Sequence, residues 1–185
     1  MIKYVIGHWT AGNYAPSSFD KQHYQLLIAG DGKAYKGADV GTSASTGGMN
    51  SVTYNIAACG GLSRTPIKPV QIESFLENAA KILKKMNLTE RAFYTHAEIG
   101  ELTRNYAVAH GIMAKPHGFI PKFNNRQITE VIPYNKWLLA NISKIDLTIL
   151  PYNNFIHNGV VTPKITVENH ADFLRSKLKW YLQHV

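Results

Sequence analysis

The sequence predicts an α/β protein, with a mixed central β-sheet flanked by α-helices in a single compact domain. Short β-prone segments alternate along the chain with longer segments whose apolar residues recur at helical spacing. No repeat or low-complexity segment interrupts this alternation. With 185 residues, of which 45% are hydrophobic, the chain is long enough to bury a core and short for two domains. We therefore expect residues 1–185 to form one domain.

Five segments are expected to be strands, and residues 2–8 show the clearest alternation. Neighbouring side chains of a strand point to opposite faces, so one face would carry Ile2, Tyr4, Ile6 and His8. The other strands are expected at about 23–29, 33–36, 52–59 and 92–96, the last ending in His96. Asp31-Gly32 lies between two of these segments and predicts a hairpin turn.

The clearest helix covers about 69–86, where apolar residues repeat on one side. Pro69 suits its first turn, and Lys84 and Lys85 complement the dipole at its C-terminal end. A second helix is expected at about 100–110, and an amphipathic C-terminal helix at about 167–184. Residues 38–51, rich in Gly, Ser and Thr, and residues 114–127, with several Pro and Gly, are expected to be loops.

The C-terminal helix is basic and also carries aromatic residues, which leaves two interpretations open. Lys177, Lys179 and Trp180 suggest contact with a membrane surface, whereas the apolar spacing is that of any helix packed on a sheet and favours packing. No run of 18 apolar residues predicts a membrane span. No signal peptide is visible in the sequence.

Charge and cysteine content narrow the function classes. The net charge of +8 and a pI near 9.5 predict attraction to anionic polymers. The chain has neither zinc-finger spacing nor a basic helix interleaved with aromatic residues, so we expect no nucleic-acid partner. The single cysteine, Cys59, excludes an internal disulfide and is expected to be a small core residue.

Two histidines and a carboxylate, His8, His96 and Asp146, have the residue types that suit one zinc ion. Three protein ligands leave a fourth position open, which is typical of a catalytic metal. In an extended Lys144-Ile145-Asp146, the lysine and the carboxylate share a face. A cation would then stand where negative charge builds up as an amide is attacked. His110 and His117 are the alternatives to Asp146.

These residues stand in phrases that resemble the type-2 N-acetylmuramoyl-L-alanine amidases. That family also contains small phage lysozyme-like amidases and the animal peptidoglycan recognition proteins. The matching phrases follow one another in the family's order over residues 1 to about 150. They are His8-Trp9-Thr10, Tyr24 to Gly32, Asn50 to Gly61, His96-Ala97-Glu98-Ile99 and Lys144-Ile145-Asp146.

The resemblance implies that His8, His96 and Asp146 hold one Zn²⁺ per chain. It also implies that Tyr24 lies beside the metal and that Lys144 stabilises the oxyanion. This chain departs from the family in two places. Ala57 stands where some members carry a glutamate base, and residues 97–143 form an insertion where many relatives have a short loop. Glu98 is expected to start a helix or to support a metal ligand rather than to act as the base.

The resemblance further implies a zinc-dependent hydrolase that cuts the amide bond between N-acetylmuramic acid and L-alanine of the stem peptide. Its partner would be peptidoglycan or muropeptides, with the zinc site in a surface cleft of a monomer. A phage endolysin is expected, made in the cytoplasm of a bacterial host and acting on the cell wall after release. A delivered toxin and a recycling amidase are alternative sources. A peptidoglycan-binding module without activity and a zinc peptidase acting within the stem peptide are alternative functions.

Overall fold

The computed structural model describes residues 1–47, 49–62, 64–100, 144, 146–147, 155–157, 160–162 and 167–185. Its main sheet has five strands in the order β3-β2-β4-β1-β5. Their bounds are β1 Tyr4–Trp9, β2 Leu26–Ile28, β3 Ala34–Lys36, β4 Thr53–Ala58 and β5 Phe93–Thr95. β1 pairs in parallel with β4 and β5, β2 pairs in parallel with β4, and β3 is antiparallel to β2. The predicted mixed sheet is therefore confirmed.

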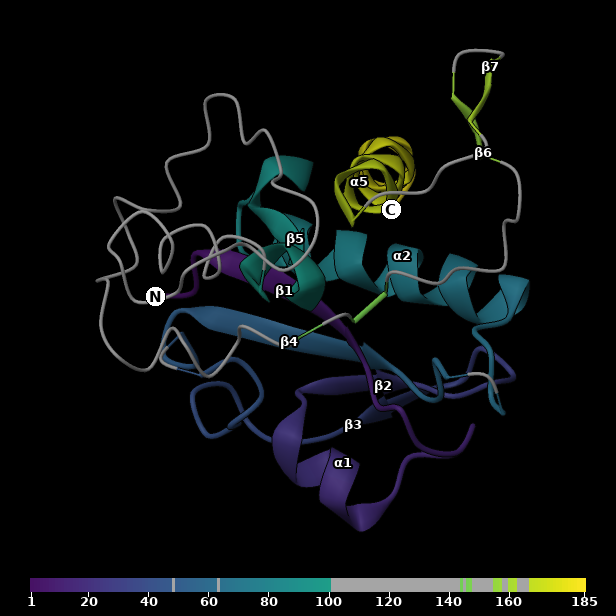
Figure 1. The fold of residues 1–185 in the computed structure, drawn as a ribbon. Helices are drawn as coiled ribbons and strands as arrows, with labels where there is room; N and C mark the ends of the chain where they lie inside the picture. Colours follow the sequence, from purple (N-terminus) through teal and green to yellow (C-terminus); the bar gives the residue numbers. More distant parts are fainter. Residues whose placement is uncertain are drawn as a thin grey trace, which may run out of the picture.

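Helices flank this sheet. They are α1 (Ser18–His23), α2 (Pro69–Lys85), the 3₁₀ turn η1 (Glu90–Ala92) and α5 (Val167–Leu182), and residues 96–100 are also helical. Figure 1 shows α2 and α5 on one side of the sheet and α1 on the other. β6 (Phe155–His157) and β7 (Val160–Thr162) form a separate antiparallel pair. The expected loop at 114–127 and residues 101–143 of the predicted insertion lie outside the described residues.

The hydrophobic core lies between the sheet and α2. Val5 of β1 and Ile56 of β4 are fully buried there, together with Phe75 of α2. Leu174 and Leu178 of α5 belong to the same core cluster, which confirms that this helix packs on the protein as its apolar spacing predicted. Across the described residues, we find no helix with both the length and the apolar character needed to cross a membrane.

The strands present a different set of side chains on the opposite face. His8 lies beside Ala57 in the parallel pairing of β1 with β4, and Ala57 lies beside Leu27 of β2. Because side chains alternate along a strand, His8 and Asn55 emerge on the face that is turned away from α2. This face holds the candidate site.

Candidate metal centre

Three segments far apart in the sequence bring His8, His96 and Asp146 together. Each offers one donor atom, and the three donor atoms lie within 4.8 Å of one another. Asp146 Oδ2 is 3.2 Å from His8 Nδ1 and 3.4 Å from His96 Nδ1. All three side chains are buried, and the two histidine rings meet edge to face.

The distances from the Asp146 carboxylate to the two histidines fit a zinc ion. Two ligands of a tetrahedral zinc, each about 2.05 Å from the metal, are separated by about 3.3 Å. The two distances from Asp146 Oδ2 match that separation. Two imidazoles and one carboxylate are also a donor set that zinc accepts with a fourth position open. The three residues therefore fit the expected metal, with His8 and His96 each presenting Nδ1.

The ionisation of the site also suits cation binding. Burial and the neighbouring His96 lower the pKa of His8, although Asp146 opposes the shift. Burial alone would raise the pKa of Asp146, but its interactions with the two histidines bring it below its ordinary value. At neutral pH the site therefore presents a neutral His8 and an anionic carboxylate, the protonation states that metal binding requires.

Asn55 fixes the orientation of His8. Its side-chain oxygen lies 3.0 Å from His8 Nε2, and an amide oxygen only accepts, so Nε2 carries the proton and Nδ1 is left for a metal. The Thr46 hydroxyl donates to the same oxygen at 2.7 Å. Asn55 Nδ2 donates to the hydroxyls of Ser43 and Thr53, both at 3.2 Å. Sequence reasoning missed this network because it joins β4 to residues 43–46, which were expected to be part of a surface loop.

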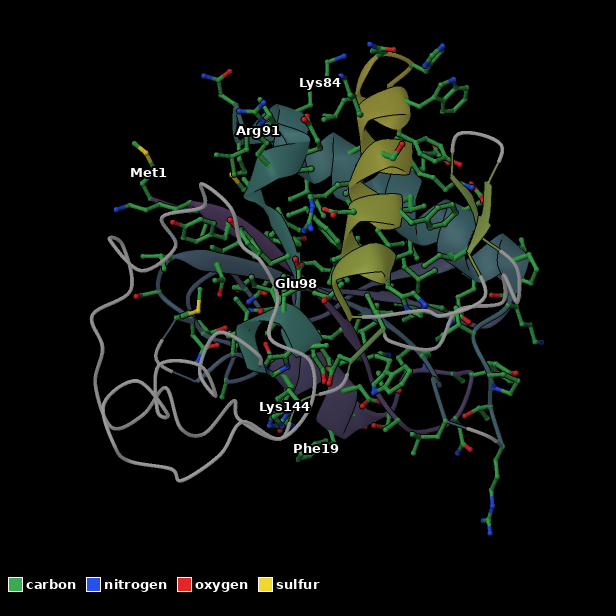
Figure 2. The ribbon with its side chains drawn as sticks, turned by 45° about the horizontal axis from the view of Figure 1, so that its top comes forward. Met1, Phe19, Lys84, Arg91, Glu98 and Lys144 are labelled. Atoms are coloured by element: carbon green, nitrogen blue, oxygen red, sulfur yellow. The ribbon has the colours of Figure 1, made fainter. Side chains whose placement is uncertain are left out.

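The sequence predicts His96 at the end of a strand, but the residue stands at the first position of a helix. β5 ends at Thr95, whose hydroxyl accepts the backbone N–H of Glu98 at 3.2 Å, while Glu98 Oε2 accepts the N–H of Thr95 at 2.8 Å. This reciprocal pair is a capping box, and it starts the helix at His96. The expected role of Glu98 at a helix start is thus confirmed. Glu98 also pairs with Arg175 of α5, and Figure 2 shows Glu98 beside that helix.

Asp146 lies in a turn, so the extended Lys144-Ile145-Asp146 expected from the sequence is wrong at its last residue. Asp146 and Leu147 have turn geometry, and Leu147 has a φ of 63°. The Leu147 side chain is fully buried in the main core and fills the space above Gly7 of β1. The turn is therefore anchored through Leu147, and this anchoring brings the Asp146 carboxylate to the two histidines.

The structure brings Tyr24 to the cluster. The rings of Tyr24 and His8 have centroids 5.1 Å apart. Burial, reinforced by the Asp146 carboxylate, raises the pKa of Tyr24, so its hydroxyl stays protonated at neutral pH. Lys144 is half-buried two residues before Asp146, and among the described residues none forms a hydrogen bond or ion pair with it. Its role beside the metal stays a prediction.

Two further expectations concern β4. Ala57 is fully buried and pairs with His8, so this position beside the metal cluster carries no carboxylate. Cys59 is buried with Leu27 and Ala57, and burial raises the pKa of its thiol to about 12. A thiol that stays protonated at neutral pH is a packing residue, as the sequence indicated.

Comparison with known proteins gives one family and several distant structures. The sequence model of Amidase_2, the N-acetylmuramoyl-L-alanine amidases, matches residues 1–112. No curated protein sequence matches the chain. The solved structure of the amidase LysC from Clostridium intestinale shares 21% identity, covers 52% of this chain and 71% of its own, and has a TM-score of 0.46.

Two other solved structures show a similar likeness. The endolysin of Thermus scotoductus bacteriophage Ph2119 shares 22% identity over 52% of this chain and 72% of its own, with a TM-score of 0.43. Human PGRP-IBETAC, solved in complex with glycosamyl muramyl pentapeptide, gives the same four values. At these identities and TM-scores the likeness does not extend to function.

The family match carries more weight, because it spans more than half of the chain and includes His8, Tyr24 and His96. Lys144 and Asp146 lie beyond its end, so Asp146 joins the cluster on geometry alone. The chain belongs to the N-acetylmuramoyl-L-alanine amidase family, Amidase_2.

Proposed function

We propose that this protein is a zinc-dependent hydrolase of peptidoglycan. The bond cut would be the amide between N-acetylmuramic acid and the L-alanine of the stem peptide, and the biological role would be that of a phage endolysin. One observation carries the proposal: in a chain of this amidase family the donor atoms of His8, His96 and Asp146 lie within 4.8 Å of one another, and the Asp146 oxygen stands at zinc spacing from both histidines. The net charge of +8 suits an anionic wall polymer as partner.

The proposed chemistry divides among the metal and two side chains. Zinc held by the three ligands would polarise the amide carbonyl and lower the pKa of a water molecule to roughly 7. The Lys144 ammonium would stabilise the negative charge that develops on the carbonyl oxygen. Tyr24, protonated at neutral pH, would donate a hydrogen bond that orients the reacting groups beside His8.

Peptidoglycan recognition without cleavage is the second candidate function, and Ala57 is the observation that favours it. The position beside His8 on the neighbouring strand carries a methyl group and no carboxylate. Proton transfer would then depend on Tyr24 or on a group outside the described residues. The three candidate zinc ligands favour hydrolysis over recognition alone, because binding a wall fragment does not require them.

Zinc removal and ligand substitution test the proposal together. Zinc bound per chain is measured by elemental analysis, and lysis by the turbidity of permeabilised bacterial cells. We expect one zinc per chain, loss of lysis with a chelator and recovery on adding zinc. His8→Ala, His96→Ala and Asp146→Ala should each lose zinc and lysis, whereas His110→Ala and His117→Ala serve as matched controls that keep both.

The outcomes separate the candidates. Full lysis by a zinc-free preparation contradicts the proposed mechanism. Zinc and peptidoglycan binding without lysis supports the recognition function instead. Loss of zinc in His117→Ala or His110→Ala, with zinc retained in Asp146→Ala, would transfer the third ligand to that histidine.

A further inference from the structure

Two buried side chains of α5 reach the segments that carry the candidate zinc ligands. Arg175 contacts the start of the helix that bears His96, and His170 contacts the residue after Asp146. Both side chains are at least 95% buried, with exposed fractions of 5% and 1%. α5 thus contacts the site from a part of the chain that follows all three ligands in sequence.

Arg175 holds the His96 segment through three acceptor atoms of two residues. Its Nη1 and Nη2 donate to the two Glu98 oxygens, both at 2.9 Å, a bidentate pair that fixes the plane of the carboxylate. Nη1 also donates to the carbonyl oxygen of Phe93 at 3.1 Å. Because Glu98 closes the capping box with Thr95, the guanidinium fixes the backbone on both sides of His96.

His170 holds the Asp146 segment. Its Nδ1 lies 3.3 Å from the carbonyl oxygen of Leu147, and since a carbonyl only accepts, Nδ1 is the donor. Leu147 has a φ of 63°, a conformation that costs a residue with a Cβ about 1–2 kcal/mol. Such a conformation persists only where surrounding contacts over-determine it. The hydrogen bond to His170 is one of these contacts, and the burial of the Leu147 side chain is another.

Contacts other than those of Arg175 and His170 attach α5 to the rest of the protein. Leu174 and Leu178 are buried in the core, and Lys177 and the Tyr181 hydroxyl both bind Glu73 of α2. A buried ion pair is weak evidence for stability, because well-packed apolar residues of similar volume often serve as well. The Arg175–Glu98 pair is therefore poorly explained as a means of docking the helix.

We propose that α5 positions the metal centre, with Arg175 orienting His96 through Glu98 and His170 orienting Asp146 through the Leu147 carbonyl. This inference rests on the proposed zinc site. Arg175 and His170 are positioning residues, since neither is one of the three donors. Outer groups that orient metal ligands typically contribute 10–100-fold to metal affinity.

A set of substitutions on α5 tests this role. His170→Leu removes the donor to Leu147, while His170→Asn keeps an N–H at a similar place. Arg175→Lys keeps the charge but loses the two-pronged contact with Glu98. Tyr181→Phe is the matched control, because it removes a hydrogen bond that docks α5 on α2 without touching either ligand segment.

Two readouts separate positioning from folding. Zinc affinity is measured by competition with a chromophoric chelator, and the visible absorption spectrum of the Co²⁺-substituted protein reports ligand geometry. We expect zinc binding to weaken about 10–100-fold in His170→Leu and Arg175→Lys, with an altered cobalt spectrum. His170→Asn should recover most of the affinity, and Tyr181→Phe should match the wild type in both readouts.

The outcomes distinguish this inference from the proposed function. A folded wild-type protein that binds no zinc contradicts the proposed function itself. If the wild type binds zinc, unchanged affinity and cobalt spectrum in folded His170→Leu and Arg175→Lys overturn the positioning role alone. Equal weakening in Tyr181→Phe would also overturn it, because general loosening of α5 would then explain the effect. If Arg175→Lys fails to fold, the comparison of His170→Leu with His170→Asn still tests the inference.

Discussion

Replacing Asn55 by alanine should weaken zinc binding through His8, although Asn55 is not itself a candidate ligand. The substitution removes the acceptor of the His8 Nε2 proton, which lies 3.0 Å from Asn55 Oδ1. His8 is fully buried, so no solvent replaces that acceptor. The ring is then free to rotate or to exchange tautomers, and either change withdraws Nδ1 from the metal.

The structure also sets the size of the effect. Loss of an outer partner of a metal-bound histidine typically costs 10–100-fold in affinity. Thr46 Oγ1 lies 3.3 Å from His8 Nε2, and once Asn55 is gone this hydroxyl is free to accept the proton. We therefore expect Asn55→Ala to fall at the lower end, about tenfold or about 1.4 kcal/mol. Adding Thr46→Val removes the substitute acceptor and should bring the loss near 100-fold.

Isothermal titration in competition with a chelator of known zinc affinity measures the zinc affinity of both variants. Circular dichroism checks that they are folded. Gln71→Met is the matched control. It removes two buried hydrogen bonds, to the carbonyl oxygens of Ile28 and Cys59, but touches no candidate ligand. Its zinc affinity should equal that of the wild type. Wild-type affinity in the folded Asn55→Ala and Thr46→Val double variant would refute the argument that this network orients His8.

Four other substitutions probe catalysis, protonation and packing. Lys144→Ala should keep zinc and lose about 10²-fold in turnover, and Tyr24→Phe should keep zinc with a loss that is small if the hydroxyl only positions substrate. Unchanged turnover in Lys144→Ala would make the lysine an ordinary surface charge. Burial lowers the pKa of His170 to about 4, so between pH 6.5 and 4 only the unfolded state binds its proton. The free energy of unfolding of the metal-free protein should therefore decrease as the pH is lowered from 6.5 to 4, by up to roughly 3 kcal/mol more than in His170→Asn. If the free energy of unfolding, measured in urea, depends on pH equally in the wild type and in His170→Asn, this prediction is wrong. Gly7→Ala places a methyl group 2.9 Å from Leu147 and 2.7 Å from the Phe93 ring, so we expect a loss of about 1–3 kcal/mol in urea unfolding. An unchanged free energy of unfolding would show that the Leu147 side chain moves aside at little energetic cost.

The elements with strong local patterns could be predicted from the sequence. The alternation in residues 2–8 predicted β1, and the apolar repeat at 69–86 predicted α2, whose bounds are Pro69–Lys85. The short α1 was missed because six residues without a buried face have no helical periodicity. Its start did carry a local signal, since Ser17 and Asp20 form a capping box.

The candidate site was predicted in part, and the missing part depends on long-range contacts. His8, His96, Asp146 and Tyr24 were singled out from short phrases, and the fold brings them together. Asn55 was not singled out, because its contact with His8 follows from the pairing of β1 with β4. The contact between Arg175 and Glu98 spans 77 positions, which no local pattern reports.

The turn at Asp146 was outside the reach of pattern reasoning for a different reason. A positive φ is expected at glycine or asparagine, whereas here it occurs at Leu147. The burial of that side chain against β1 and the hydrogen bond from His170 help to explain the conformation. An extended Lys144-Ile145-Asp146 was the natural expectation without them.

Mass spectrometry of purified muropeptides after digestion tests the central claim most directly. The wild-type protein with one zinc per chain should release stem peptides that begin with a free L-alanine amino group and should leave N-acetylmuramic acid with a free carboxyl group. The metal-free protein and Asp146→Ala should release neither product. Fragments cut within the stem peptide would identify a peptidase. Intact muropeptides after incubation with a zinc-loaded protein that binds them would contradict hydrolysis and leave recognition as the function.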